Sequence, residues 1–63
     1  MTTMNLAKLI EARTLPEAEA AANRALDLGI AYYANGRTAR VLGRQIRRLA
    51  SREYRLDAQV EFA

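Results

Sequence analysis

The stretch RTARVLGRQIRRLASREYRLDAQVEF, residues 37–62, decides the fold predicted for this chain. Most of its apolar residues recur every three or four positions, which is the spacing of one face of an amphipathic helix. We call this set the apolar seam, and it consists of Ala39, Leu42, Ile46, Leu49, Leu56 and Val60. The spacing predicts one long helix over residues 38–62.

Seven arginines would lie on the other side of that helix. At about 100° per residue they fall within an arc of roughly 140°. They are Arg37, Arg40, Arg44, Arg47, Arg48, Arg52 and Arg55. Residues 1–36 hold three basic and four acidic residues, whereas residues 37–63 hold seven arginines and three acids. This asymmetry predicts an anionic partner, either nucleic acid or an acidic protein surface, and a merely solvated face is the alternative.

A second helix is predicted over residues 15–35 from its start and stop signals. Thr14 and Glu17 have the spacing of a capping box, and Pro16 suits the first turn of a helix. Gly36 is a typical residue just beyond a helix end. The apolar positions cover roughly 200° of this helix, which is more than one neighbouring helix can cover.

The predicted fold class is therefore all-α, with one domain over residues 1–63. The short link near Gly36 makes the two long helices an antiparallel hairpin. A short first helix is predicted over residues 5–13, where Leu6, Leu9 and Ile10 form a small apolar face.

Self-association is predicted from the small size of the chain. A chain of 63 residues buries only about 60% of the surface that its unfolded form exposes. Without Cys it has no disulfide, so a partner subunit is the remaining route to a larger core. The predicted interface of this homo-oligomer consists of Leu26, Ile30, Tyr32, Tyr33, Leu42, Ile46, Leu49, Glu53 and Leu56.

Glu53 interrupts the apolar seam between Leu49 and Leu56. A buried carboxylate is costly unless it is paired. We therefore expect Glu53 to pair with Arg24 or Arg13 of a neighbouring helix or protomer, and so to set the register of the assembly.

Residues 28–36, LGIAYYANG, resemble the first helix and the turn of a tetratricopeptide repeat. The shared features are a Leu-Gly pair, Tyr32 three residues after it, and Gly36 at the turn. With one residue inserted in the turn, the second-helix packing positions of that family fall on Leu42, Ile46 and Leu49. Ala25 stands where the family has a large aromatic, and the closing proline is absent. The resemblance covers about half of the chain and implies a helical hairpin and a protein-binding scaffold.

The composition argues against catalysis and metal binding. The chain has no His, which is the commonest general base and the commonest metal ligand, and no Cys, which supplies thiolate ligands to metals. We expect no catalytic residue, no cofactor, no metal and no small-molecule substrate. No basic start followed by an apolar run precedes the predicted helices, and no apolar stretch approaches about 20 residues. We therefore expect a cytoplasmic protein without a membrane partner.

The predicted function is non-catalytic binding. We expect a small protein-binding module of the adaptor or inhibitor type, of a size that mobile elements encode, acting through an oligomeric hairpin and the arginine face. The alternative is a basic nucleic-acid-binding protein that uses the same arginines. A helix-turn-helix with its turn at Gly43 is one form of that alternative, although the apolar seam runs across this position.

Overall fold

The computed structural model describes all 63 residues and contains three strands and one helix. In chain order the elements are β1 (Thr2–Glu11), α1 (Leu15–Ala34), β2 (Ala39–Ala50) and β3 (Glu53–Phe62). The predicted all-α class is wrong, because the fold is α/β. The segments predicted as helices over residues 5–13 and 38–62 are strands, so there is neither a helical hairpin nor a tetratricopeptide-like helix pair.

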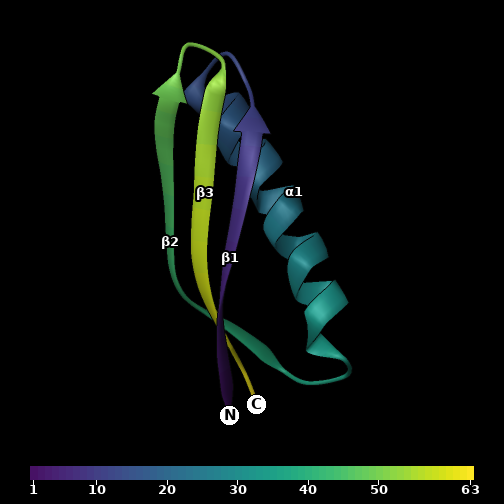
Figure 1. Ribbon diagram of the computed structural model, residues 1–63. Coiled ribbons are helices and arrows are strands. Elements are labelled where there is room, and N and C mark those ends of the chain that lie inside the picture. Colours follow the sequence, from purple (N-terminus) through teal and green to yellow (C-terminus); the bar gives the residue numbers. More distant parts are fainter.

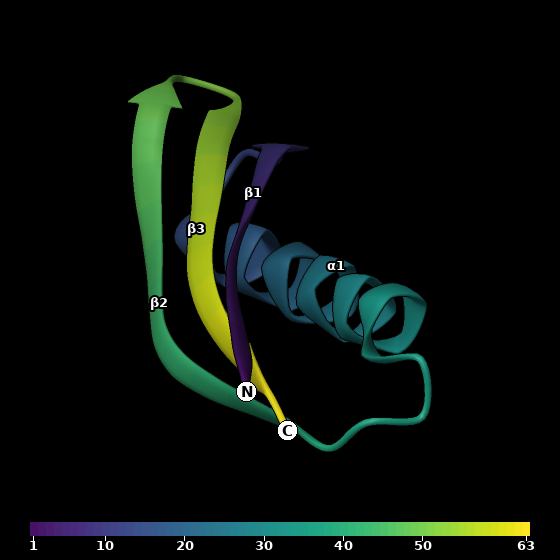
Figure 2. The same cartoon turned by 60° about the horizontal axis from the view of Figure 1, so that its bottom comes forward.

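The three strands form one antiparallel sheet in the order β1-β3-β2. The last strand of the chain therefore lies in the centre, and β1 and β2 form the two edges (Figure 1). The helix packs against one face of the sheet and lies nearest to β1 (Figure 2). The other face of the sheet is not covered, and we call it the open face. Figure 2 shows that the later turns of α1 extend beyond β1, on the side away from β2.

The sequence of β3 explains why it is the central strand. Its residues alternate strictly between buried and more exposed positions, which is the period of two that a half-buried strand requires. The side chains that point toward α1 are Tyr54, Leu56, Ala58, Val60 and Phe62. The side chains on the open face are Glu53, Arg55, Asp57, Gln59 and Glu61.

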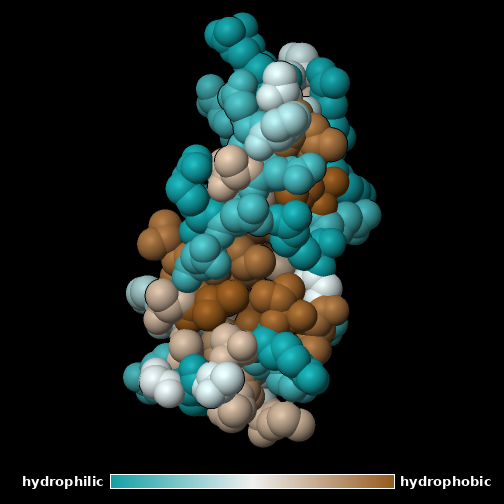
Figure 3. Space-filling model, turned by 180° about the vertical axis from the view of Figure 1, so that it is seen from behind, coloured by the Kyte–Doolittle hydropathy of each residue, from teal (hydrophilic) through white to brown (hydrophobic).

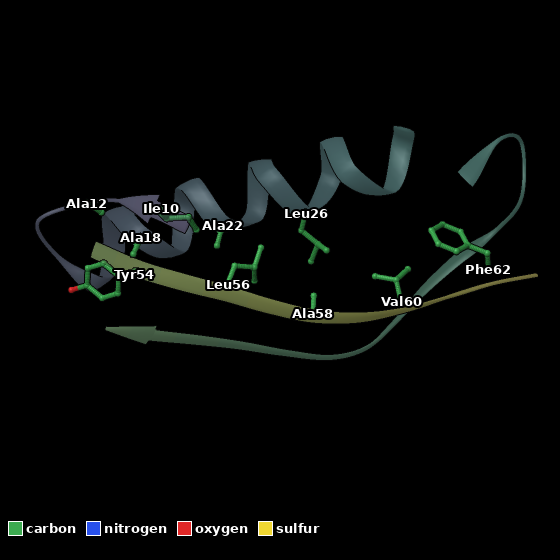
Figure 4. Close-up of a cluster of buried hydrophobic side chains, with 10 residues drawn as sticks. All are labelled: Ile10, Ala12, Ala18, Ala22, Leu26, Tyr54, Leu56, Ala58, Val60 and Phe62. Carbon is green, nitrogen blue, oxygen red and sulfur yellow. The ribbon is translucent and has the colours of Figure 1, made fainter. Parts of the chain in front are cut away.

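The core is one cluster of ten buried residues between α1 and the sheet (Figure 4). Four of the ten are alanines, and the largest fully buried side chains are Phe62, Leu56 and Val60. The side chains of Ala18 and Ala22 on α1 are completely buried. Because these side chains are so small, the helix can lie close to the sheet.

The prediction for α1 is confirmed, to within one residue at its end. Thr14 is the N-cap, and its Oγ1 accepts a hydrogen bond from the Glu17 backbone N–H at 3.3 Å. The helix ends where Asn35 and Gly36 adopt left-handed backbone angles, with φ of 50° and 82°. Glycine has no Cβ to oppose such an angle, and asparagine tolerates it better than most residues.

Replacing Thr14 by alanine should lower the free energy of unfolding by about 1 kcal/mol. The backbone N–H of Glu17 then loses its acceptor at the start of α1. Urea unfolding followed by far-UV circular dichroism measures the change. The matched control is Thr3→Ala, at an exposed strand position, and a larger loss in the control would contradict the capping role.

Candidate interaction surfaces

The free edge of β1 is the longest regular backbone surface without a partner in this chain. On one side, all ten residues of β1 pair with β3, from Thr2 opposite Phe62 to Glu11 opposite Glu53, without a register shift. On the other side β1 has no neighbouring strand. An unbroken strand edge of this kind is a template for pairing with another chain.

The backbone groups that face this edge follow from the hydrogen-bond pattern. The Ala12 N–H donates to the Arg52 carbonyl at 3.1 Å, which continues the β1–β3 register by one residue. In an antiparallel ladder, alternate residues turn their N–H and C=O toward the same neighbour. The even-numbered residues of β1 therefore turn their backbone N–H and C=O toward β3. The residues whose backbone N–H and C=O point to the free edge are Thr3, Asn5, Ala7, Leu9 and Glu11.

An apolar groove runs between α1 and β1 on the same side of the molecule. Its volume is about 560 Å³, and nine of its twelve lining residues are hydrophobic. The helix residues Leu28 and Tyr32 border the groove and are 72% and 80% exposed. Figure 3 shows the molecule from behind, with apolar surface gathered in its lower half, toward the end of α1. The β1 side thus combines free backbone groups with exposed apolar side chains.

The other edge of the sheet, along β2, is built differently. The pairing of β2 with β3 has register shifts between Val41 and Gly43 and between Arg48 and Ala50, so Leu42 and Leu49 are the extra residues of two β-bulges. The strand carries four arginines and no acidic residue. Bulges and charged side chains are two means by which proteins block pairing at an edge strand.

The seven predicted arginines do not share one face. Successive strand residues point to opposite sides, so the sheet separates them. Arg40, Arg47 and Arg55 lie on the open face, and Arg44 and Arg48 lie on the helix side. Arg37 precedes β2, and Arg52 lies in the turn between β2 and β3.

Two of these arginines form ion pairs on the open face. Arg40 contacts Glu61 and Arg55 contacts Asp57, each at 3.1 Å. On the helix side, Arg44 donates to the Asn23 side chain. Arg47 forms neither an ion pair nor a side-chain hydrogen bond and lies directly opposite Arg55, which is an unfavourable like-charge position.

Arg37 has a structural role at the end of α1. Its guanidinium donates to the backbone carbonyl oxygens of Ala34 and Tyr33, at 2.9 and 3.0 Å. It also lies over the Phe62 ring, 5.0 Å from the ring centroid. These contacts provide donors for carbonyl groups that a helix end leaves without partners. The Arg37 guanidinium therefore already has hydrogen-bond acceptors and an aromatic ring as partners within the fold.

The predicted interface residues are divided between the core and the surface. Leu26 and Leu56 are buried, while Ile30 and Ile46 are partly buried. The exposed members are Tyr32, Tyr33, Leu42, Leu49 and Glu53. Of these, only Tyr32 and Tyr33 line the groove beside β1, where their rings meet edge to face with centroids 4.8 Å apart.

Glu53 lies on the open face and not in an apolar seam. It pairs in register with Glu11 at the end of the sheet and forms no ion pair with Arg13 or Arg24. The premise of a buried carboxylate is therefore wrong, because the residue begins a strand and is exposed.

The residues of β1 whose backbone groups point to the free edge were not predicted as a binding site from the sequence. The signal that indicates them is the alternation of Met4, Leu6 and Ile10, which point toward α1, with the residues between them.

No group of three or more acidic side chains is close enough to hold a metal ion. The one helix is too polar to cross a membrane.

Comparison with protein families, curated proteins and solved structures finds no match to this chain.

Proposed function

We propose that this chain is a small, non-catalytic protein-binding module that accepts an extended segment of its partner at the free edge of β1. The observation that carries the proposal is the regular ten-residue edge with no bulge. Strand addition supplies hydrogen bonds to backbone groups that are otherwise satisfied only by water. The adaptor or inhibitor role and the cytoplasmic location expected from the sequence remain part of this proposal.

The groove beside β1 supports the same mode of binding. Main-chain hydrogen bonds are insensitive to sequence, so a strand-addition site obtains its specificity from pockets for alternate side chains. Here every second side chain of an added strand would point to the side of the sheet that holds α1. Leu28 and Tyr32 overhang that side and present an apolar surface to it.

A proline in β1 tests the proposal with little damage to the fold. The N–H of Ala7 faces the free edge, so Ala7→Pro removes no bond of the β1–β3 ladder. The matched control is Arg44→Pro in β2. Arg44 lies opposite Ala58, whose backbone groups face β1, so its N–H points to the opposite free edge.

A displayed library of ten-residue peptides should yield binders of the wild type that also bind Arg44→Pro and lose at least tenfold in affinity for Ala7→Pro. Circular dichroism verifies that each variant is folded. Equal affinity for both proline variants would contradict binding at β1. The search is made at protein concentrations low enough to leave the edge free of other copies.

Nucleic-acid binding is a second candidate, favoured by the arginines of β2. The strand holds Arg40, Arg44, Arg47 and Arg48 without an acid, and Arg47 has no partner of its own. Arginine suits phosphate oxygens because its planar group donates two parallel hydrogen bonds. A phosphate backbone lying along this edge would relieve the repulsion between Arg47 and Arg55.

Titration with a random-sequence DNA duplex at several salt concentrations tests this candidate. Binding through β2 should weaken log-linearly with salt. The double variant Arg47→Ala/Arg48→Ala should reduce the slope by roughly two, because each phosphate contact contributes about 0.9. Arg13→Ala/Arg24→Ala is the control of equal charge outside the sheet. An equal effect of both pairs would show attraction by net charge only.

A further inference from the structure

We infer that the segment added at β1 is β1 of a second copy of this chain, in an antiparallel pair centred on Ala7. This inference rests on the proposed strand-addition function and names its partner. The result would be a continuous six-stranded sheet with β2 at both ends.

The length of β1 and the direction of its backbone groups restrict the register to an axis at Leu6 or Ala7, and we place it at Ala7. In an antiparallel pair of identical strands, each step forward along one copy is a step back along the other. The numbers of two paired residues therefore always add up to twice the number of the residue on the two-fold axis. Centring the axis on Ala7 aligns Thr2 with the partner's Ala12, so the whole strand is paired. The residues whose backbone groups point to the free edge then lie opposite one another. Thr3 pairs with the partner's Glu11, and Asn5 pairs with the partner's Leu9, so that each pair can exchange N–H and C=O hydrogen bonds.

An axis on Leu6 pairs as many residues, with Glu11 opposite the partner's Met1, but it places Ala7 opposite the partner's Asn5, so the cross-linking test below separates the two registers. An axis at any other residue leaves more of the strand unpaired.

The side chains of β1 are compatible with this pairing. Lys8 and Glu11 are the only charged residues of the strand. In the inferred register Lys8 lies opposite the partner's Leu6, so no like charges meet directly. Ala7 lies on the axis, where its methyl group leaves room for its own symmetry mate. By contrast, pairing through β2 would have to accommodate two bulges and four arginines.

The helix contributes a second part of the same interface. A two-fold axis perpendicular to the sheet places both helices on one face of the joined sheet. The later turns of α1 already extend beyond β1, so each helix would reach toward its counterpart (Figure 2). Leu28 and Tyr32 are 72% and 80% exposed on that side, and large aromatic side chains are frequent anchors of interfaces.

The single chain exposes slightly more surface than an average monomer of its mass. The chain exposes 4484 Å². A monomeric protein of 7.1 kDa is expected to expose about 4,100 Å². The excess reflects an elongated molecule of 37 × 15 × 14 Å, whose core contains only ten residues. A second copy would enlarge that core across the β1 side.

The mass in solution is the first test. Light scattering should give twice the 7.1 kDa mass for the wild type and for Arg44→Pro, and the monomer mass for Ala7→Pro. Tyr32→Ala should raise the dissociation constant of the dimer at least tenfold while the far-UV spectrum keeps its shape. A dimer that persists in folded Ala7→Pro would overturn the inference.

Disulfide cross-linking tests the register, since the natural chain has no cysteine. In Ala7→Cys the two Cα atoms lie about 5.5 Å apart, within the range that a disulfide spans. In Asn5→Cys they lie about 14 Å apart, because four residues of strand separate them. Oxidation should therefore cross-link Ala7→Cys and not Asn5→Cys. The reverse result would overturn the centring on Ala7.

The outcomes separate this inference from the proposed function. If the wild type is a monomer and peptides bind it in a manner that Ala7→Pro abolishes, strand addition holds and self-pairing is wrong. If the wild type is a monomer and no peptide binds, both are wrong. If Ala7→Pro alone abolishes the dimer, both are supported.

Discussion

Replacing Phe62 by alanine is expected to lower the free energy of unfolding by about 3–5 kcal/mol. At about 0.05–0.15 kcal/mol per residue, a chain of 63 residues has a free energy of unfolding of roughly 3–9 kcal/mol, so this change should remove about half of it or more. Phe62 is completely buried although it is the penultimate residue, and it is the largest of the fully buried side chains. The Arg37 guanidinium covers its ring and is itself anchored to the end of α1. Truncation would therefore leave a cavity where the helix end, β2 and β3 meet.

Urea unfolding followed by far-UV circular dichroism, at a fixed protein concentration, measures this loss. The control is Leu42→Ala, because Leu42 is 44% exposed in a bulge of β2 and should lose less than about 1 kcal/mol. Similar losses in the two variants would show that residue 62 is not part of the core in solution.

Replacing Ala22 by leucine should cost about 1–3 kcal/mol, although leucine is an excellent helix former. The Ala22 side chain is completely buried where α1 lies against the sheet, above Leu56 (Figure 4). Three additional carbon atoms at this point would force the helix away from β3. The expected cost is steric and arises in the folded state.

The control is Ala20→Leu, on an exposed position of the same helix. The intrinsic helix preference changes equally in both variants, so the difference between their unfolding midpoints isolates the packing against the sheet. If Ala22→Leu were as stable as Ala20→Leu, the close approach of helix and sheet would be refuted.

The helix α1 could be predicted from the sequence because its signals are local. Thr14, Pro16 and Glu17 specify its start, and Gly36 specifies its end, through hydrogen bonds and backbone angles within a few residues. Such signals do not depend on the rest of the fold, and the structure confirms them.

The two strands after α1 could not be recognised from spacing by three and four. In β2, the bulges at Leu42 and Leu49 insert extra residues and break the period of two. The apolar residues of that strand consequently imitate a helix. In β3 the strict alternation from Tyr54 to Phe62 was present, but the apolar seam used only Leu56 and Val60 from it. Arginine and leucine, which favour helices, occur in both strands, so long-range strand pairing overrides their intrinsic preference here.

The candidate binding surface was predictable only in part. Exposed Tyr32 and Tyr33 were expected at an interface, and they line the groove beside β1. The free edge itself depends on the strand order, because β3 takes the central position and leaves β1 outside. Strand order is a property of the whole chain, and no segment of the sequence shows it.

The two irregular positions in β2 have a consequence for assembly size. A sheet whose edges both accept strands can grow into a fibre, whereas one receptive edge permits a single junction. With Leu42 and Leu49 displaced from the ladder, β2 offers no regular template at either end of the inferred pair. Assembly then stops at two copies, and a concentrated solution of this protein should hold closed dimers without fibrils.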